Sequence, residues 1–171
     1  QPDEDLFIED FNQHPEVKLV IAPHVIDENH LVEIIRKLKR PYVRYTRADE
    51  KNVRKADCLI IDCFGLLSSI YRYGEIAYIG GGFGVGIHNT LEAAVYGTPV
   101  IFGPKYQKFQ EAIQLLEAKG AFSVKDYEEL KTLLDRMLTD EVFLRESGMN
   151  ASNYVTGNAG ATDKIMSMIN F

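Results

Sequence analysis

The sequence predicts a doubly wound α/β domain built on a parallel, Rossmann-like sheet. Short apolar runs alternate along the chain with segments of helical periodicity. The runs are apolar throughout rather than at every second residue, which is typical of strands buried on both faces of a parallel sheet. A length of 171 residues suits one domain with its own core.

Six apolar runs are predicted to be strands. They span residues 17–23, 42–46, 58–62, 76–81, 99–103 and 121–124. Helices are predicted between or after them, some with a terminating glycine such as Gly74 or Gly120. They span residues 27–40, 65–74, 89–97, 108–120 and 126–138, and the tail is predicted to hold two more helices broken near 157–160.

Composition excludes several classes of protein. The net charge of -6 argues against a nucleic-acid partner. No apolar run reaches the roughly 18 residues of a membrane helix, and no signal peptide opens the chain, so we expect it to be soluble. The four histidines are scattered, and we expect neither a metal site nor a cofactor. Cys58 and Cys63 are predicted to be free thiols on opposite faces of a strand, in a reducing compartment.

A glycine-rich turn, Gly80–Gly86, follows one predicted strand, and a second turn follows the next strand at the same sheet edge. Ligands of doubly wound sheets bind at this edge. The turn does not match the dinucleotide fingerprint, because Gly82, Gly84 and Gly86 give G-x-G-x-G, which disfavours an NAD(P) oxidoreductase. It is not a P-loop either, since Lys and Ser or Thr do not follow Gly86.

Two interpretations of this turn remain open. The glycines make a tight connection only, or they let an anion approach the N-terminus of the helix at 89–97. Asn89 and Glu92 have the spacing of a variant capping box, but a carboxylate at Glu92 also suits a vicinal diol. His88 either donates to a phosphate or caps and packs.

The motifs I-H-N-x-L-E at 87–92, P-V at 99–100 and G-P at 103–104 occur together. With the upstream D-C-F-G-L-L segment at 62–67, they resemble the C-terminal domain of 3-deoxy-D-manno-octulosonic acid (Kdo) transferases, over residues 17 to about 140. The resemblance implies half of a GT-B glycosyltransferase, in which this domain binds CMP-Kdo and the whole enzyme transfers Kdo to lipid A.

The resemblance also implies which residues bind the donor. They are Gly84, Gly86, Ile87, His88, Asn89, Glu92, Phe64, Gly65, Pro23 and His24. By position, the turn up to Asn89 would lie at the CMP phosphate, Glu92 at the ribose, and Phe64 and Gly65 near the cytosine. The family often has Pro-Arg-His at this strand end, with the arginine on the donor. This chain has Pro23-His24 without the arginine, so His24 would have to replace that contact.

We therefore expect residues 1–171 to form a single donor-binding domain, without the N-terminal acceptor domain that supplies the general base. No catalytic residue is expected in this chain, and the lipid A precursor would be bound through the missing domain. A strand of the A-G-S/T type, central in the family's sheet, is also missing before Gln1. Its absence is predicted to leave a gap, a shortened sheet or a place for another chain. The parent enzyme would work at the cytoplasmic face of the bacterial inner membrane.

Two alternatives stay open beside this interpretation. The chain could be the donor domain of another GT-B transferase that uses a UDP-sugar, which predicts tighter binding of UDP than of CMP. It could also be a non-catalytic nucleotide-binding module, in which Asn89→Ala and Glu92→Ala leave ligand binding intact.

Overall fold

The computed structural model describes residues 2–159, and within them all six predicted strands are present. Every strand pair is parallel, which confirms the predicted α/β class. The strands are β1 Leu19–Ile21, β2 Tyr42–Arg44, β3 Cys58–Ile60, β4 Ala77–Ile79, β5 Val100–Phe102 and β6 Ala121–Ser123. The α-helices are α1 Pro2–Gln13, α2 Glu28–Lys37, α3 Glu50–Val53, α4 Leu67–Ile70, α5 Leu91–Ala94, α6 Gln110–Glu117, α7 Tyr127–Thr139 and α8 Glu141–Asn158, with 3-10 turns η1 Tyr45–Arg47 and η2 Tyr71–Tyr73.

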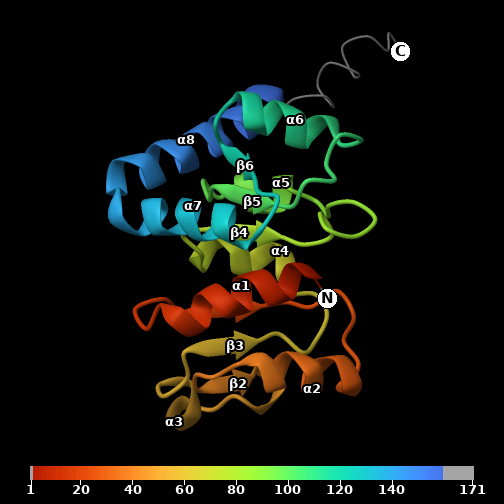
Figure 1. Cartoon of the computed structure of the whole chain (residues 1–171), viewed down its shortest axis with the longest axis vertical. Coiled ribbons are helices and arrows are strands. Elements are labelled where there is room, and N and C mark those ends of the chain that lie inside the picture. Colours follow the sequence, from red (N-terminus) through yellow and green to blue (C-terminus); the bar gives the residue numbers. More distant parts are fainter. Residues whose placement is uncertain (1, 160–171) are drawn as a thin grey trace, which may run out of the picture.

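The strands form two separate sheets of three, in the orders β1-β3-β2 and β4-β5-β6 (Figure 1). No ladder joins β1 to β4 in the part of the chain that the structure describes. Rings at the ends of these two strands nevertheless stack, as described below, so β1 and β4 are neighbouring edges. The gap between the two sheets therefore lies between β1 and β4.

Helix α1 spans this gap, and the periodicity analysis did not identify it (Figure 1). Its residues Ile8 and Phe11 are buried in the core of the first sheet together with Ile21. Phe7 turns to the second sheet, where its ring packs against Tyr78 of β4 at 5.5 Å. The acidic first turn of α1 is a typical helix start that the sequence offered. One helix thus belongs to the cores of both sheets.

The residue that follows α1 is tied to α7 near the other end of the chain. The His14 Nδ1 atom lies 3.0 Å from the Asp10 carbonyl oxygen, and Nε2 lies 3.2 Å from Asp135 Oδ1. Burial by itself lowers the pKa of His14, but the Asp10 carbonyl and the nearby carboxylates of Asp10, Glu16 and Asp135 raise it overall. His14 therefore connects α1 to α7, and these neighbours favour its protonated form.

Two predicted helices differ from the observed ones, and the tail agrees as far as the structure describes it. The segment 65–74 is α4 followed by the 3-10 turn η2, closed where the Gly74 N–H donates to the Tyr71 carbonyl at 3.0 Å. The segment 89–97 contains only the four-residue α5, which starts after Thr90. In the tail, α8 ends at Asn158, which confirms the first predicted tail helix and its break near 157–160; the second predicted tail helix lies outside the described residues.

The cysteines are both free, as predicted. Cys58 is buried in β3, and burial raises the pKa of its thiol to about 12, so it stays protonated and behaves as a small apolar side chain. Cys63 is half-buried just beyond the same strand.

Candidate functional site

The ends of β4 and β5 interlock through glycines. A Cβ atom on Gly82 would lie 2.5 Å from the Gly103 Cα atom, so neither position has room for a side chain. The Lys105 backbone N–H donates to the Gly82 carbonyl at 3.0 Å, and the Phe109 ring would meet a Cβ on Gly86 at 2.9 Å. The two strand ends predicted to lie side by side therefore form one packed unit.

Hydrogen bonds inside the Gly80–Gly86 turn use several of its N–H groups. Gly84 and Gly86 both donate to the Gly81 carbonyl, at 2.9 and 3.1 Å, and His88 donates to the Gly80 carbonyl at 3.2 Å. Gly81 and Gly86 have φ values of +95° and +139°, a region that favours glycine. These three N–H groups are thus already bonded within the turn and are not free to bind an anion.

Gly84 differs from Gly81, Gly82 and Gly86, whose conformation or packing requires a glycine. Its φ is not positive, and an added Cβ would make only an ordinary contact, 3.5 Å from the Gly81 carbonyl oxygen. Turn packing therefore does not require a glycine here. The missing side chain leaves an open surface, which fits close approach by a ligand.

His24 and His88 come together across the gap between the sheets. His24 follows β1 and His88 follows the glycine turn after β4, and their rings stack with centroids 4.6 Å apart and planes 23° apart. Both side chains are exposed. Two residues singled out by sequence, 64 positions apart, thus form one imidazole pair at the predicted sheet edge.

Asn89 and Glu92 also contact each other, although not as the predicted capping box. The Leu91 N–H donates to Asn89 Oδ1 at 3.0 Å, and Asn89 Nδ2 donates to Glu92 Oε1 at 3.1 Å. Thr90, rather than Asn89, is the N-cap. A four-residue helix has little macrodipole, so α5 by itself offers an anion weak stabilisation. The Asn89 side chain instead fixes the direction of the Glu92 carboxylate.

Burial divides the remaining predicted residues. Ile87 is packed in the core with Ile79 and Ala93, so only its backbone could reach a ligand. Pro23 is buried as well. In contrast, Phe64 is 83% exposed beyond the end of β3, next to Gly65 in the left-handed region at φ +88°.

A buried carboxylate holds the start of the Phe64 loop. Asp62 accepts from Arg44 Nε at 2.8 Å, from the Thr46 N–H at 2.9 Å and from Thr46 Oγ1 at 2.6 Å. Burial alone raises the pKa of Asp62, but the hydrogen bonds from Thr46 and Arg44 lower it to about 2. Asp62 is therefore ionised at neutral pH, and it anchors the chain immediately before the exposed Phe64.

Sequence reasoning missed two residues beside the site. The Lys105 ammonium donates to the Gly84 carbonyl at 2.8 Å, and its signal was its place directly after the G-P motif. Tyr71 lies near Glu92, and burial, together with the Glu92 charge, raises the pKa of the tyrosine to about 12. No local pattern marked Tyr71.

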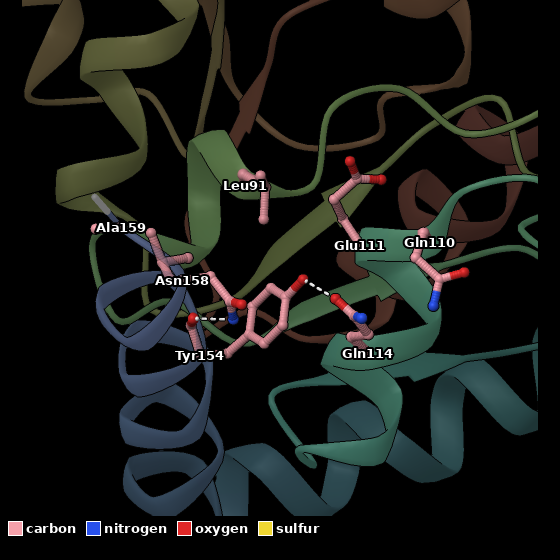
Figure 2. Close-up of a pocket in the computed structure, with 8 residues that line it drawn as sticks. Leu91, Gln110, Glu111, Gln114, Tyr154, Asn158 and Ala159 are labelled. Carbon is pink, nitrogen blue, oxygen red and sulfur yellow. Dashed lines mark hydrogen bonds between the residues drawn. The ribbon is translucent and has the colours of Figure 1, made fainter. Parts of the chain in front are cut away.

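A hollow of about 340 Å³ adjoins the site through Leu91, the neighbour of Glu92 (Figure 2). It lies between α5, the first turns of α6 and the end of α8. The Tyr154 hydroxyl donates to Gln114 Oε1 at 2.6 Å and closes one side, while Glu111 brings a carboxylate to the other (Figure 2). None of the ten residues predicted from sequence lines it.

Two classes of feature are absent from residues 2–159. No three His, Cys, Asp or Glu side chains there are grouped so that they could hold a metal ion. None of the described helices is both long and apolar enough to cross a membrane.

Solved structures define the class of this fold. The C-terminal CMP-Kdo binding domain of WaaA from Acinetobacter baumannii superposes with a TM-score of 0.76 and 18% identity, over 90% of this chain and 83% of that one. The C-terminal domain of a group 1 glycosyl transferase (LpcC) from Francisella tularensis gives a TM-score of 0.59 and 16% identity, over 91% and 76%. The fold is that of the C-terminal domain of GT-B glycosyltransferases.

Curated relatives narrow the class further, although no family model matches the chain. The 3-deoxy-D-manno-octulosonic acid transferase of Aquifex aeolicus is 36% identical over 125 residues, which are 72% of this chain and 34% of the relative. That of Rickettsia bellii is 32% identical over 66% and 28%. A bifunctional glycosyltransferase/methyltransferase of Fusobacterium nucleatum is 27% identical over 90% and 26%. The chain is thus similar in sequence to Kdo transferases and spans between 26% and 34% of the length of these curated relatives.

Proposed function

We propose that this chain is the donor-binding domain of a glycosyltransferase that transfers Kdo from CMP-Kdo to a lipid A precursor. The observation that carries the proposal is the homology to Kdo transferases, combined with the open sheet edge where His24, His88, Asn89 and Glu92 meet. The acceptor and the general base would belong to another domain. The parent enzyme would work at the cytoplasmic face of the bacterial inner membrane.

Each exposed side chain then has a role in binding the nucleotide. His88, paired with His24, and Asn89 face the phosphate, while the Glu92 carboxylate accepts from the ribose hydroxyls. Phe64, which is exposed and close to the anchored Asp62, would cover the cytosine. Gly84 and Gly65 leave room for the ligand.

The chemistry of this half of the site concerns the leaving group. When Kdo departs, negative charge develops on the phosphate of CMP, and hydrogen-bond donors that are already in place stabilise it. The imidazole pair and the Asn89 amide would supply such donors. The general base that activates the acceptor hydroxyl would come from the other domain.

Calorimetric titration of the chain tests the donor assignment. We expect CMP to bind, UDP to bind more weakly, and NAD to give no heat. Tighter binding of UDP than of CMP would indicate that the donor is a UDP-sugar rather than CMP-Kdo. The fold assignment would be unaffected. Heat from NAD without heat from CMP would overturn the proposal.

The role of Glu92 is tested by comparing CMP with 2′-deoxy-CMP. A hydrogen bond from the ribose to a carboxylate predicts a preference for CMP of about tenfold in the unaltered chain. Glu92→Ala should abolish this preference, whereas Glu117→Ala, on the exposed face of α6, should keep it. An unchanged preference in Glu92→Ala would refute the ribose contact and would favour a nucleotide-binding module of another kind.

A further inference from the structure

The candidate phosphate site lacks a permanent positive charge. The ten residues that sequence assigns to it include no Lys and no Arg, and Glu92 adds a negative charge. The N–H groups of Gly84, Gly86 and His88 are donated within the turn. An anionic ligand would therefore face a carboxylate without a matching cation, unless a neighbouring residue supplied one.

Lys105 is placed to supply that cation. It lies on the turn after β5, and its backbone N–H bonds to the Gly82 carbonyl, which fixes the origin of its side chain. The ammonium reaches back across the glycine turn to the Gly84 carbonyl at 2.8 Å. An added Cβ at Gly84 would make only an ordinary contact, and the residue is exposed, so a ligand can approach the surface here.

An ammonium carries three N–H donors, and the bond to Gly84 uses one. The Lys105 side chain is exposed, so the other donors lie on the ligand-facing edge of the sheet. The contact to Gly84 also holds the long side chain in place before a ligand arrives, which reduces the conformational entropy lost on binding.

We propose that Lys105 is a specificity-determining residue that binds the phosphate of the donor nucleotide, where it supplies the positive charge that no other assigned residue provides. The inference rests on the proposed function, because it takes the ligand to be a nucleoside monophosphate sugar. It adds a residue and a physical role that the motif pattern did not contain.

The test compares CMP with cytidine, which lacks the phosphate, by calorimetric titration of four chains. These are the unaltered protein, Lys105→Gln, Lys105→Arg and Lys108→Gln, the last being an exposed lysine of the same turn with the same loss of charge. We expect Lys105→Gln to weaken CMP binding by about fivefold, the effect of one exposed ion pair, and to leave cytidine binding unchanged. Lys105→Arg should restore most of the CMP affinity, and Lys108→Gln should match the unaltered protein. The loss in Lys105→Gln should shrink as salt is added, because salt screens exposed charges.

The outcomes separate this inference from the proposed function. Unchanged CMP affinity in Lys105→Gln overturns the inference alone. An equal loss for CMP and cytidine also overturns it, since that result assigns Lys105 only to holding the turn. If the unaltered chain binds no CMP, the proposed function falls, and the inference falls with it.

Discussion

Each sheet has three parallel strands, but the order is β1-β3-β2 in the first and β4-β5-β6 in the second, and their ligand-facing ends are held by different forces. In the first sheet, the end of β3 is fixed by the buried Asp62 carboxylate and its bonds to Arg44 and Thr46. In the second, the ends of β4 and β5 are fixed by backbone contact between Gly82 and Gly103. Charge therefore holds the exposed Phe64 loop, while close packing holds the glycine turn. The first should respond to pH and the second to side-chain volume.

The largest expected effect on stability comes from adding a side chain where the ends of β4 and β5 are in backbone contact. Gly82→Ala places a methyl group 2.5 Å from the Gly103 backbone, which cannot move without separating β4 from β5. We expect a loss of about 3 kcal/mol in the free energy of unfolding, measured by urea denaturation. Gly84→Ala is the matched control. A loss below about 1 kcal/mol in Gly82→Ala would show that the interlock yields easily.

Removing the Asp62 charge at the end of β3 should have the next largest effect on stability. The pKa of Asp62 is lowered from 3.8 to about 2 in the fold, so its contribution is present above pH 3.8 and is lost as the pH falls through about 2. The difference corresponds to about 2 kcal/mol at neutral pH. Asp62→Asn should lose this amount of stability, and its free energy of unfolding should fall less steeply as the pH is lowered. Glu75→Gln, an exposed carboxyl change, should leave this pH dependence as it is.

The His14 contact between α1 and α7 should have a smaller effect on the free energy of unfolding. Unlike the contribution of Asp62, this one should decrease as the pH rises. Because the fold raises the pKa of His14 from 6.5, its stabilisation is complete below pH 6.5 and is lost as the pH rises through the raised value. We expect less than about 1 kcal/mol, since Asp135 is partly exposed. Urea titrations across this range should show the slope in the unaltered chain and not in His14→Gln. Asp135→Asn should reduce the slope, and an equal slope in all three would contradict the assignment.

The smallest effect on stability is expected at Gly84. Gly84→Ala should change the free energy of unfolding by less than about 0.5 kcal/mol, because its Cβ meets no close neighbour and its φ suits other residues. If a ligand lies over this position, the same change should weaken CMP binding in calorimetry. A stable variant with unchanged CMP affinity would show that the ligand does not lie over Gly84.

Local sequence patterns predicted the strands because each is a short apolar run, and apolar runs become buried. All three residues of β5, for example, are buried. The patterns located the glycine turn and Glu92 through motif spacing. They missed what depends on distant partners: α1 is stabilised by Ile21 and Tyr78, and the stack of His24 on His88 requires the ends of β1 and β4 to be neighbours. Lys105 escaped notice because its role depends on which carbonyl its side chain reaches.

Helix α1 has a consequence for the order of folding. It is the first element of the chain, yet its contacts reach Tyr78 in β4, and His14 beside it contacts Asp135, 121 positions away. Contacts of such long separation close large loops and form slowly. During synthesis, α1 can pack on Ile21 early, but its contacts with β4 and α7 can form only after those elements have emerged, and these late contacts are the ones that join the two sheets.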